Sequence, residues 1–131
     1  MPAMPTADVL APLLRGDLDT VSFVRDYVEL RIDYNLLRCM TRPIVRTGRG
    51  DIRFPEPGSR DALCALIDSA VSQVAATDDA IELLMDSGDT LVLPLGEASR
   101  TLPDGRVLPE AVHLVPADER GRLDTAKMVV W

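Results

Sequence analysis

Aromatic residues are scarce in this chain: its 131 residues include two Phe, two Tyr and one Trp, which is 4% of the sequence. A hydrophobic core therefore has to be built mostly from aliphatic side chains, and a hydrophobic content of 47% is enough for one. The length fits one ordinary domain, whose folding removes roughly two thirds of the unfolded chain's surface from water. The scarcity also argues against a binding mode in which nucleic-acid bases stack on exposed rings.

Histidine and cysteine are also rare, with one His and two Cys. Glu110 lies three residues before His113, but no second His or nearby Cys completes a metal site. Cys39 and Cys64 each lie in an apolar run, which is typical of a buried free thiol and not of a disulfide scaffold. A Cys–His nucleophilic pair would have to use His113, and no signature marks either Cys as its partner.

The sequence motifs that would indicate a cofactor or a hydrolase are missing. No G-x-x-x-x-G-K-[ST] or G-x-G-x-x-G loop is present to bind phosphates, and no G-x-S-x-G turn is present to expose a nucleophilic serine. The acidic clusters at 77–80 and 86–89 do not continue with EF-hand spacing, so they are read as turns. We therefore predict no cofactor, no metal and no catalytic residue.

Positive charge is in deficit: 14 Lys and Arg stand against 21 Asp and Glu, for a net charge of −7. Such a chain repels phosphate backbones, so we predict no nucleic-acid partner. Arginines bunch between Arg38 and Arg60, but Asp51 and Glu56 lie in the same run, which indicates a mixed surface. The net charge favours a partner that carries a basic patch.

Long hydrophobic runs are missing as well. No apolar run approaches the roughly 18 residues that would suggest a membrane span. The first ten residues have no basic segment followed by an apolar one, so they do not resemble a signal peptide. We expect a cytoplasmic protein that contacts no membrane.

The first third of the chain predicts a flexible start, a short helix and two long strands. We expect residues 1–5 to be flexible and residues 6–17 to form a short N-terminal helix that Pro12 limits or bends. Alternation over 28–34 predicts a strand. In residues 21–23 the apolar side chains fall at odd positions, whereas in 28–34 they fall at even positions. This change of parity predicts a turn or bulge within 24–27, so residues 21–23 are either a separate strand or the bulged start of the same one. Residues 36–48 read as a second long strand that Pro43 places at an edge or interrupts.

The clearest helical pattern covers about residues 59–74. Ser59 is a suitable N-cap, and apolar residues recur downstream at the spacing of one helix face. Residues 80–95 read as a hairpin that turns at Ser87 and Gly88. Residues 96–110 are expected to form an irregular loop, followed by short strands at 111–115 and 127–131.

Hairpins with one dominant helix predict the α+β class. We expect one domain over residues 1–131, in which a twisted, mostly antiparallel sheet packs the helix at 59–74 on one face and carries the short N-terminal helix. Glu29, Arg31 and Asp33 belong to the solvated face of the strand at 28–34, while the other face, through Tyr34, enters the core. Arg25 and Asp26 lie at the break in parity, where a bulge or turn would re-aim side chains.

Three segments together carry a resemblance: SFVRDYVELRIDYN, PGSRDALCALID and DSGDTLVLPL. With the late PEAVHLVP and the terminal MVVW, they resemble a family of small bacterial proteins of unknown function, over about residue 21 to the C-terminus. The resemblance implies no catalytic residue. Small acidic bacterial domains of this kind resemble immunity proteins paired with toxins, by analogy of size, charge and fold class alone.

Two functions remain open. The first is a non-enzymatic protein–protein interaction domain, either immunity- or inhibitor-like or self-associating as a homodimer. The second is a small-molecule-binding protein or small enzyme, with a pocket between helix and sheet or under the loop at 96–110. The candidate interaction or pocket residues are Arg25, Asp26, Tyr27, Arg31, Tyr34 and His113.

Overall fold

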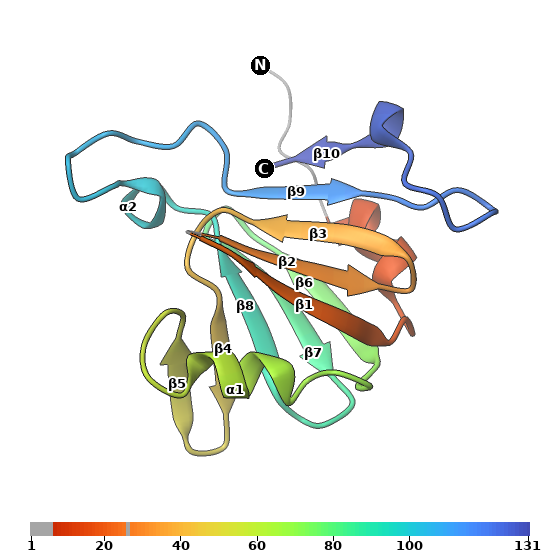
Figure 1. Ribbon diagram of the computed structural model, residues 1–131, viewed down its shortest axis with the longest axis horizontal. Coiled ribbons are helices and arrows are strands. Elements are labelled where there is room, and N and C mark those ends of the chain that lie inside the picture. Colours follow the sequence, from red (N-terminus) through yellow and green to blue (C-terminus); the bar gives the residue numbers. More distant parts are fainter. Residues whose placement is uncertain (1–6, 26) are drawn as a thin grey trace.

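Two five-stranded antiparallel sheets make up most of the computed structural model, which describes residues 7–25 and 27–131 (Figure 1). The first sheet has the order β1-β2-β3-β9-β10 and the second the order β5-β4-β8-β7-β6. The broad α+β class is confirmed, with mostly β content. No helix in the described part of the chain is long and apolar enough to cross a membrane.

The elements follow one another as short strands with brief helical turns between them. The first sheet contains β1 (Leu18–Val24), β2 (Tyr27–Ile32), β3 (Asn35–Cys39), β9 (Val112–Val115) and β10 (Val129–Val130). The second contains β4 (Ile44–Thr47), β5 (Gly50–Arg53), β6 (Val71–Ala76), β7 (Ala80–Met85) and β8 (Thr90–Pro94). The helices are η1 (Ala7–Leu13), α1 (Ser59–Cys64), α2 (Glu97–Arg100) and η2 (Thr125–Lys127).

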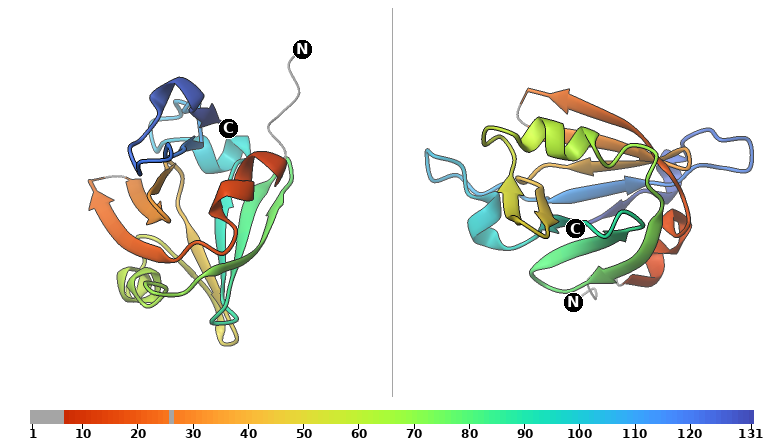
Figure 2. Two further views of the ribbon diagram at one scale, coloured as in Figure 1. Left: turned by 90° about the vertical axis from the view of Figure 1, so that its right-hand side faces the viewer. Right: turned by 90° about the horizontal axis from the view of Figure 1, so that it is seen from below.

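Aliphatic side chains from both sheets share one hydrophobic core. In β2 the alternating residues Val28, Leu30 and Ile32 are fully buried, and β7 buries Ile81 and Leu83 in the same way. Full burial of such a side chain contributes about 1.5–3 kcal/mol. The left view of Figure 2 shows β1 and β2 (orange) and β6 and β7 (green) on opposite sides of the molecule.

Two connections fix one sheet against the other. At one end, a bridge between Asp17 and Ala70 ties the start of β1 to the start of β6. At the other end, the buried Thr41 hydroxyl donates to the Pro94 carbonyl oxygen over 2.7 Å and joins the β3–β4 connection to β8. The candidate site described below lies at this second end.

The predicted helix at 59–74 is wrong beyond its first turns. α1 ends at Cys64, and residues 71–76 form strand β6, paired with β7. A bulge between Val71 and Gln73 shifts the register, so the inward residues are Val71, Val74 and Ala76. An extra residue in a strand turns the period of two into a spacing of three, which resembles one face of a helix.

The N-terminus of α1 also differs from expectation. Gly58, at φ +87°, occupies the N-cap position, and no side chain caps the helix. Ser59, the expected cap, is the first helical residue, and its buried Oγ has no hydrogen-bond partner among the described residues. Asp68, at φ +75°, turns the chain toward β6.

The predicted long strand at 36–48 is two strands in different sheets. β3 lies in the interior of the first sheet between β2 and β9, and β4 belongs to the second sheet. The chain leaves the ladder at 40–43, where Pro43 has no N–H to donate. β3 is therefore not an edge strand, and Pro43 marks the crossing from one sheet to the other.

The N-terminal helix is a 3-10 helix over Ala7–Leu13, with Pro12 inside it. Leu10 and Leu13 are buried in the hydrophobic core, so this helix covers part of that core. The predicted flexibility of residues 1–5 concerns residues that lie outside the described ranges.

The break in parity between Phe23 and Val28 is a hairpin turn. β1 is a separate strand, Val24 pairs with Tyr27, and Arg25 has φ +45°. The predicted turn is thus confirmed at Arg25, while Asp26 lies outside the described residues.

The expectation that Tyr34 enters the core is wrong. Asp33 and Tyr34 form the β2–β3 turn at φ +48° and +69°, and Tyr34 is 63% exposed. The strand ends at Ile32, two residues earlier than the predicted strand at 28–34, so the side chain of Tyr34 leaves the strand face.

The predicted hairpin at 80–95 is confirmed as β7 and β8. Short strands are confirmed as β9 and β10. The loop expected at 96–110 begins with α2, and residues 101–108, which we call the flap, follow it. A bridge between Thr101 and Val107 closes the flap on itself.

Candidate anion-binding cleft

A cleft of about 830 Å³ opens where the flap faces the ends of both sheets. This volume is within the range of about 300–1,000 Å³ found for ligand sites. In Figure 1 the ends of β1 and β3, the helix α1 and the segment with α2 all lie on the left. The residues that line this arginine cleft are Arg25, Tyr27, Met40, Thr41, Arg42, Phe54, Pro55, Arg60, Ser99, Arg100, Thr101, Leu102, Pro103, Asp104, Arg106 and Leu108.

The charge of the cleft is opposite to that of the chain. Among its described lining residues, five are arginines and only Asp104 is acidic, whereas the whole chain has 14 basic and 21 acidic residues. A neighbouring hollow of about 360 Å³ shares Arg42 with the cleft and adds Arg53. The cleft and this hollow together are lined by six arginines and one acidic residue among the described residues.

Most of these arginines have no acidic partner. Arg106 pairs with Asp104 over 2.7 Å, but its side chain is 77% exposed, and such pairs contribute little. Within residues 7–25 and 27–131, no ion pair with a carboxylate is formed by Arg25, Arg42, Arg60 or Arg100.

Two arginines outside the cleft contact carboxylates. On the exposed face of β4, Arg46 contacts both Asp51 at 3.2 Å and Glu82 at 3.1 Å. Arg38 on β3 contacts Glu29 at 3.2 Å. Six other arginines outside the cleft likewise form no ion pair among the described residues, so it is the grouping of four such arginines around one cavity that distinguishes the cleft.

Two aromatic rings hold Arg60 in place. Its guanidinium carbon lies 5.5 Å from the ring centre of Phe23 and 5.2 Å from that of Phe54, and the two rings stack at 5.7 Å. Such cation–π contacts are worth about 0.5–1 kcal/mol at exposed sites. Stacking uses the face of the guanidinium group, while its N–H donors lie in the plane and remain available to a ligand.

Backbone carbonyl groups hold Arg100. Its Nε donates to the Leu95 carbonyl oxygen over 3.1 Å, and its Nη1 donates to that of Leu108 over 2.7 Å. The Leu108 amide in turn donates to the Arg100 carbonyl oxygen over 2.8 Å. Arg100 thus fastens the flap to α2 and to the end of β8, and it keeps further N–H donors.

Arg25, Arg42 and Arg60 are all exposed, but no ring or carbonyl contact among the described residues holds the side chain of Arg25 or Arg42. The β1–β2 turn presents Arg25, and the β3–β4 connection presents Arg42. A non-glycine residue in the left-handed region, such as Arg25, costs roughly 1–3 kcal/mol and is enriched at functional sites. The cleft therefore combines two fixed guanidinium groups with two at its rim.

Apolar side chains also line the arginine cleft. They come from β2, from the β3–β4 connection, from the segment after β5 and from the flap. These residues are Tyr27, Met40, Phe54, Pro55, Leu102, Pro103 and Leu108. The wall therefore suits a ligand that has an apolar part in addition to its negative charge.

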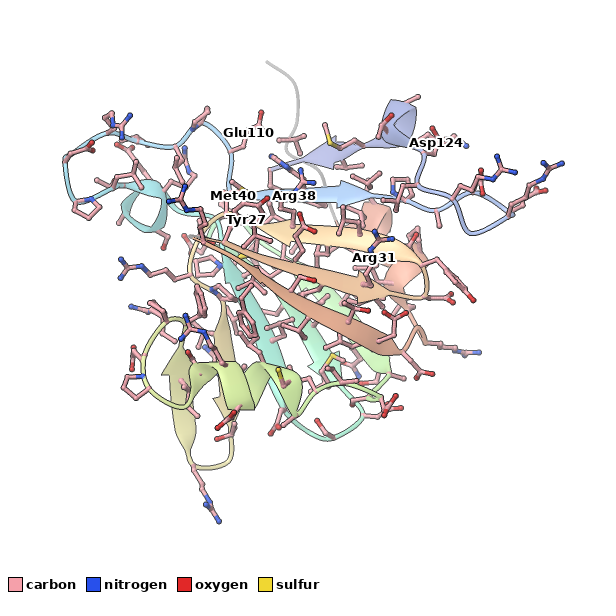
Figure 3. All side chains as sticks on the ribbon, in the orientation of Figure 1. Tyr27, Arg31, Arg38, Met40, Glu110 and Asp124 are labelled. Carbon is pink, nitrogen blue, oxygen red and sulfur yellow. The ribbon has the colours of Figure 1, made fainter. Side chains whose placement is uncertain are left out.

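A charged network adjoins the cleft through Tyr27. Arg38 lies over the Tyr27 ring at 6.0 Å, and its Nη1 is 3.3 Å from Nδ1 of His113. His113 Nε2 pairs with the Glu110 carboxylate. Figure 3 shows Tyr27, Arg38 and Met40 close together at one end of the strands, with Glu110 beside them.

The six predicted site residues separate into groups. Arg25 and Tyr27 line the arginine cleft, and His113 reaches it only through Arg38. Arg31 and Tyr34 line a different hollow of about 380 Å³, toward the opposite end of β2, where Figure 3 shows Arg31. Asp26 lies outside the described residues.

Sequence reasoning missed four lining arginines: Arg42, Arg60, Arg100 and Arg106. Two of them lie in the arginine run at 38–60, for which the sequence predicts a mixed surface because Asp51 and Glu56 interrupt it. The structure separates these charges, since Asp51 pairs with Arg46 on β4 and neither acid lines the cleft. The concentration of arginines at 38–60 is the sequence feature that could have indicated the cleft.

The two cysteines have different environments. Cys39 is fully buried in β3, and this burial raises the pKa of its thiol to about 11. Its Sγ lies 3.5 Å from the Thr41 carbonyl oxygen, to which it donates. Cys64 is exposed on α1. No group of three potential metal ligands occurs among the described residues.

Comparison of the chain with protein-family models, with curated proteins and with solved structures found no match. The resemblance to the family of small bacterial proteins stays a prediction. A function for this chain therefore has to be inferred from the cleft.

Proposed function

We propose that this protein is a non-enzymatic binding protein that takes a ligand with two or more negative charges into the arginine cleft. One observation carries the proposal: four arginines around a single cavity have no carboxylate partner among the described residues. Other arginines of the chain also have no carboxylate partner, but only here do four of them line one cavity of the described structure.

Arginine suits this role better than a point charge would. Its planar guanidinium forms two parallel hydrogen bonds with a carboxylate or a phosphate, and it remains protonated at all ordinary pH values. Arg60 and Arg100 are already held by rings and by carbonyl groups, so little side-chain freedom is lost when a ligand binds.

The Coulomb attraction between the arginines and an anionic ligand gives the expected dissociation constant. At 4 Å, two unit charges attract by about 1 kcal/mol in bulk water and by about 4 kcal/mol near a protein surface. Two or three such contacts, less the cost of association, correspond to a dissociation constant between about 1 µM and about 1 mM. Affinity should fall as salt rises, because the cleft is open to solvent.

The proposal refines both earlier hypotheses. An interaction domain that uses this cleft would take an acidic partner, whereas the net charge alone favoured a basic one. A small-molecule-binding protein would take a small polyanion at the same place. Immunity-like and self-associating roles remain predictions.

Isothermal titration calorimetry with sodium tripolyphosphate as the probe tests the proposal. We expect binding to the wild type, and binding weakened about fivefold to thirtyfold by Arg42→Gln or Arg60→Gln, which is about 1–2 kcal/mol per lost contact. Arg46→Gln is the matched control, because Arg46 is exposed and lies outside the cleft. No binding, or equal weakening by all three substitutions, would refute the proposal.

A further inference from the structure

We infer that the ligand of the arginine cleft is a short acidic peptide segment of a partner protein, with apolar side chains between its carboxylates. This inference rests on the proposed function and names the class of ligand. It follows from the presence of both arginines and apolar side chains among the residues that line the cleft.

The arginines come from separate segments of the chain. Arg25 follows β1, Arg42 follows β3, Arg60 belongs to α1 and Arg100 to α2. A single phosphate group requires donors that converge on one point, as in a glycine-rich loop. Donors spread over four elements instead fit carboxylates that are spaced along a chain.

The apolar side chains that line the cleft also favour a peptide as the ligand. Met40, Leu102, Pro103 and Leu108 line the cleft together with the arginines, and Leu108 also provides the carbonyl group that holds Arg100. An inorganic anion would leave these side chains in contact with water. Leucine or phenylalanine side chains of a peptide would cover them and gain hydrophobic free energy.

Net charge argues against a nucleic acid as the occupant. A strand longer than the cleft would lie against the rest of a surface whose chain carries a net charge of −7. Screening limits the repulsion felt by a short peptide, because charges more than about 8 Å away act weakly at physiological salt. A short segment therefore meets mainly the arginines.

Calorimetry with three capped probes tests the inference. The first peptide is Glu-Leu-Glu-Leu-Glu-Glu, the second is Glu-Gly-Glu-Gly-Glu-Glu, and the third probe is tripolyphosphate. We expect the leucine peptide to bind at least fivefold more tightly than the glycine peptide, and Arg42→Gln to weaken both. Leu108→Ala, which keeps the backbone carbonyl, should weaken only the leucine peptide, whereas Val107→Ala, outside the cleft lining, should change neither.

Each contrary result has a distinct meaning. Binding of tripolyphosphate without preference for the leucine peptide would overturn the peptide inference and leave the proposed function intact. Absence of tripolyphosphate binding would overturn the proposed function itself, and the peptide inference with it. Peptide binding that is unaffected by both Arg42→Gln and Arg60→Gln would show that the peptide binds outside the cleft. Tighter binding of an RNA hexanucleotide than of the leucine peptide would show that the inferred class of ligand, an acidic peptide, is wrong.

Discussion

Arg100 is the residue that holds the flap over the arginine cleft, and Arg100→Met should loosen it. Methionine has similar length and packs against the same neighbours, but it has no N–H groups. The carbonyl groups of Leu95 and Leu108 would both lose their donor, at 3.1 and 2.7 Å respectively.

The size of the effect follows from those two contacts. Hydrogen bonds to charged groups are worth about 1.5–3 kcal/mol each, but water replaces part of this where the side chain is half exposed, as Arg100 is. We therefore take about 1 kcal/mol for each bond, or about 2 kcal/mol in total, which corresponds to about a thirtyfold rise in the open population of the flap.

Hydrogen exchange measured by NMR reports this opening directly. The Leu108 amide donates to Arg100 and the Leu102 amide donates to Arg106, so both should exchange about 10- to 30-fold faster in the variant. The Asp86 amide, which donates to Ala70 at 2.8 Å, should exchange at an unchanged rate.

Arg106→Met is the control, because its side chain makes only an exposed pair with Asp104. It should leave the flap amides within about twofold of the wild type. Unchanged exchange at Leu108 and Leu102 in Arg100→Met would show that Arg100 does not hold the flap.

Three further predictions concern the scaffold. Asn35→Ala should destabilise the protein by about 2–4 kcal/mol in urea unfolding, since Asn35 is buried and accepts from the Ala117 amide at 2.8 Å. Cys39 has a folded pKa of about 11 against an ordinary 9.0, so its stabilising contribution is complete below pH 9 and lost between pH 9 and 11; Cys39→Ala should flatten that part of a plot of unfolding free energy against pH. Gly16→Ala should lower the thermal midpoint, because its Cβ would lie 2.7 Å from Cβ of Asp33.

Regular alternation made part of the fold predictable. Ile81 and Leu83 recur at a period of two with a Gly-containing turn after them, and both the strand and the hairpin are confirmed. The same reasoning failed at Val71 and Val74, because the bulge between Val71 and Gln73 gave a strand the spacing of a helix. Only pairing with β7, a tertiary contact, distinguishes the two.

The site was less predictable than the fold. The turn at Arg25 follows from parity, but nothing local indicates that Arg42, Arg60 and Arg100 meet there. Arg42 reaches the cleft because the chain crosses between the sheets at 40–43, where the sequence predicts a continuous strand. The net charge of −7 also concealed a positive cleft, because the sum over a chain does not report where its charges lie.

Titration with tripolyphosphate, followed through the arginine Nε–Hε signals in NMR spectra, tests most directly whether the arginine cleft binds anions. The signals of Arg42 and Arg60 should shift together and saturate with one dissociation constant, while that of Arg46, on the exposed face of β4, should remain in place. Shifts of similar size at all three arginines, or no saturation up to about ten times the upper limit of 1 mM expected for the dissociation constant, would contradict a specific site.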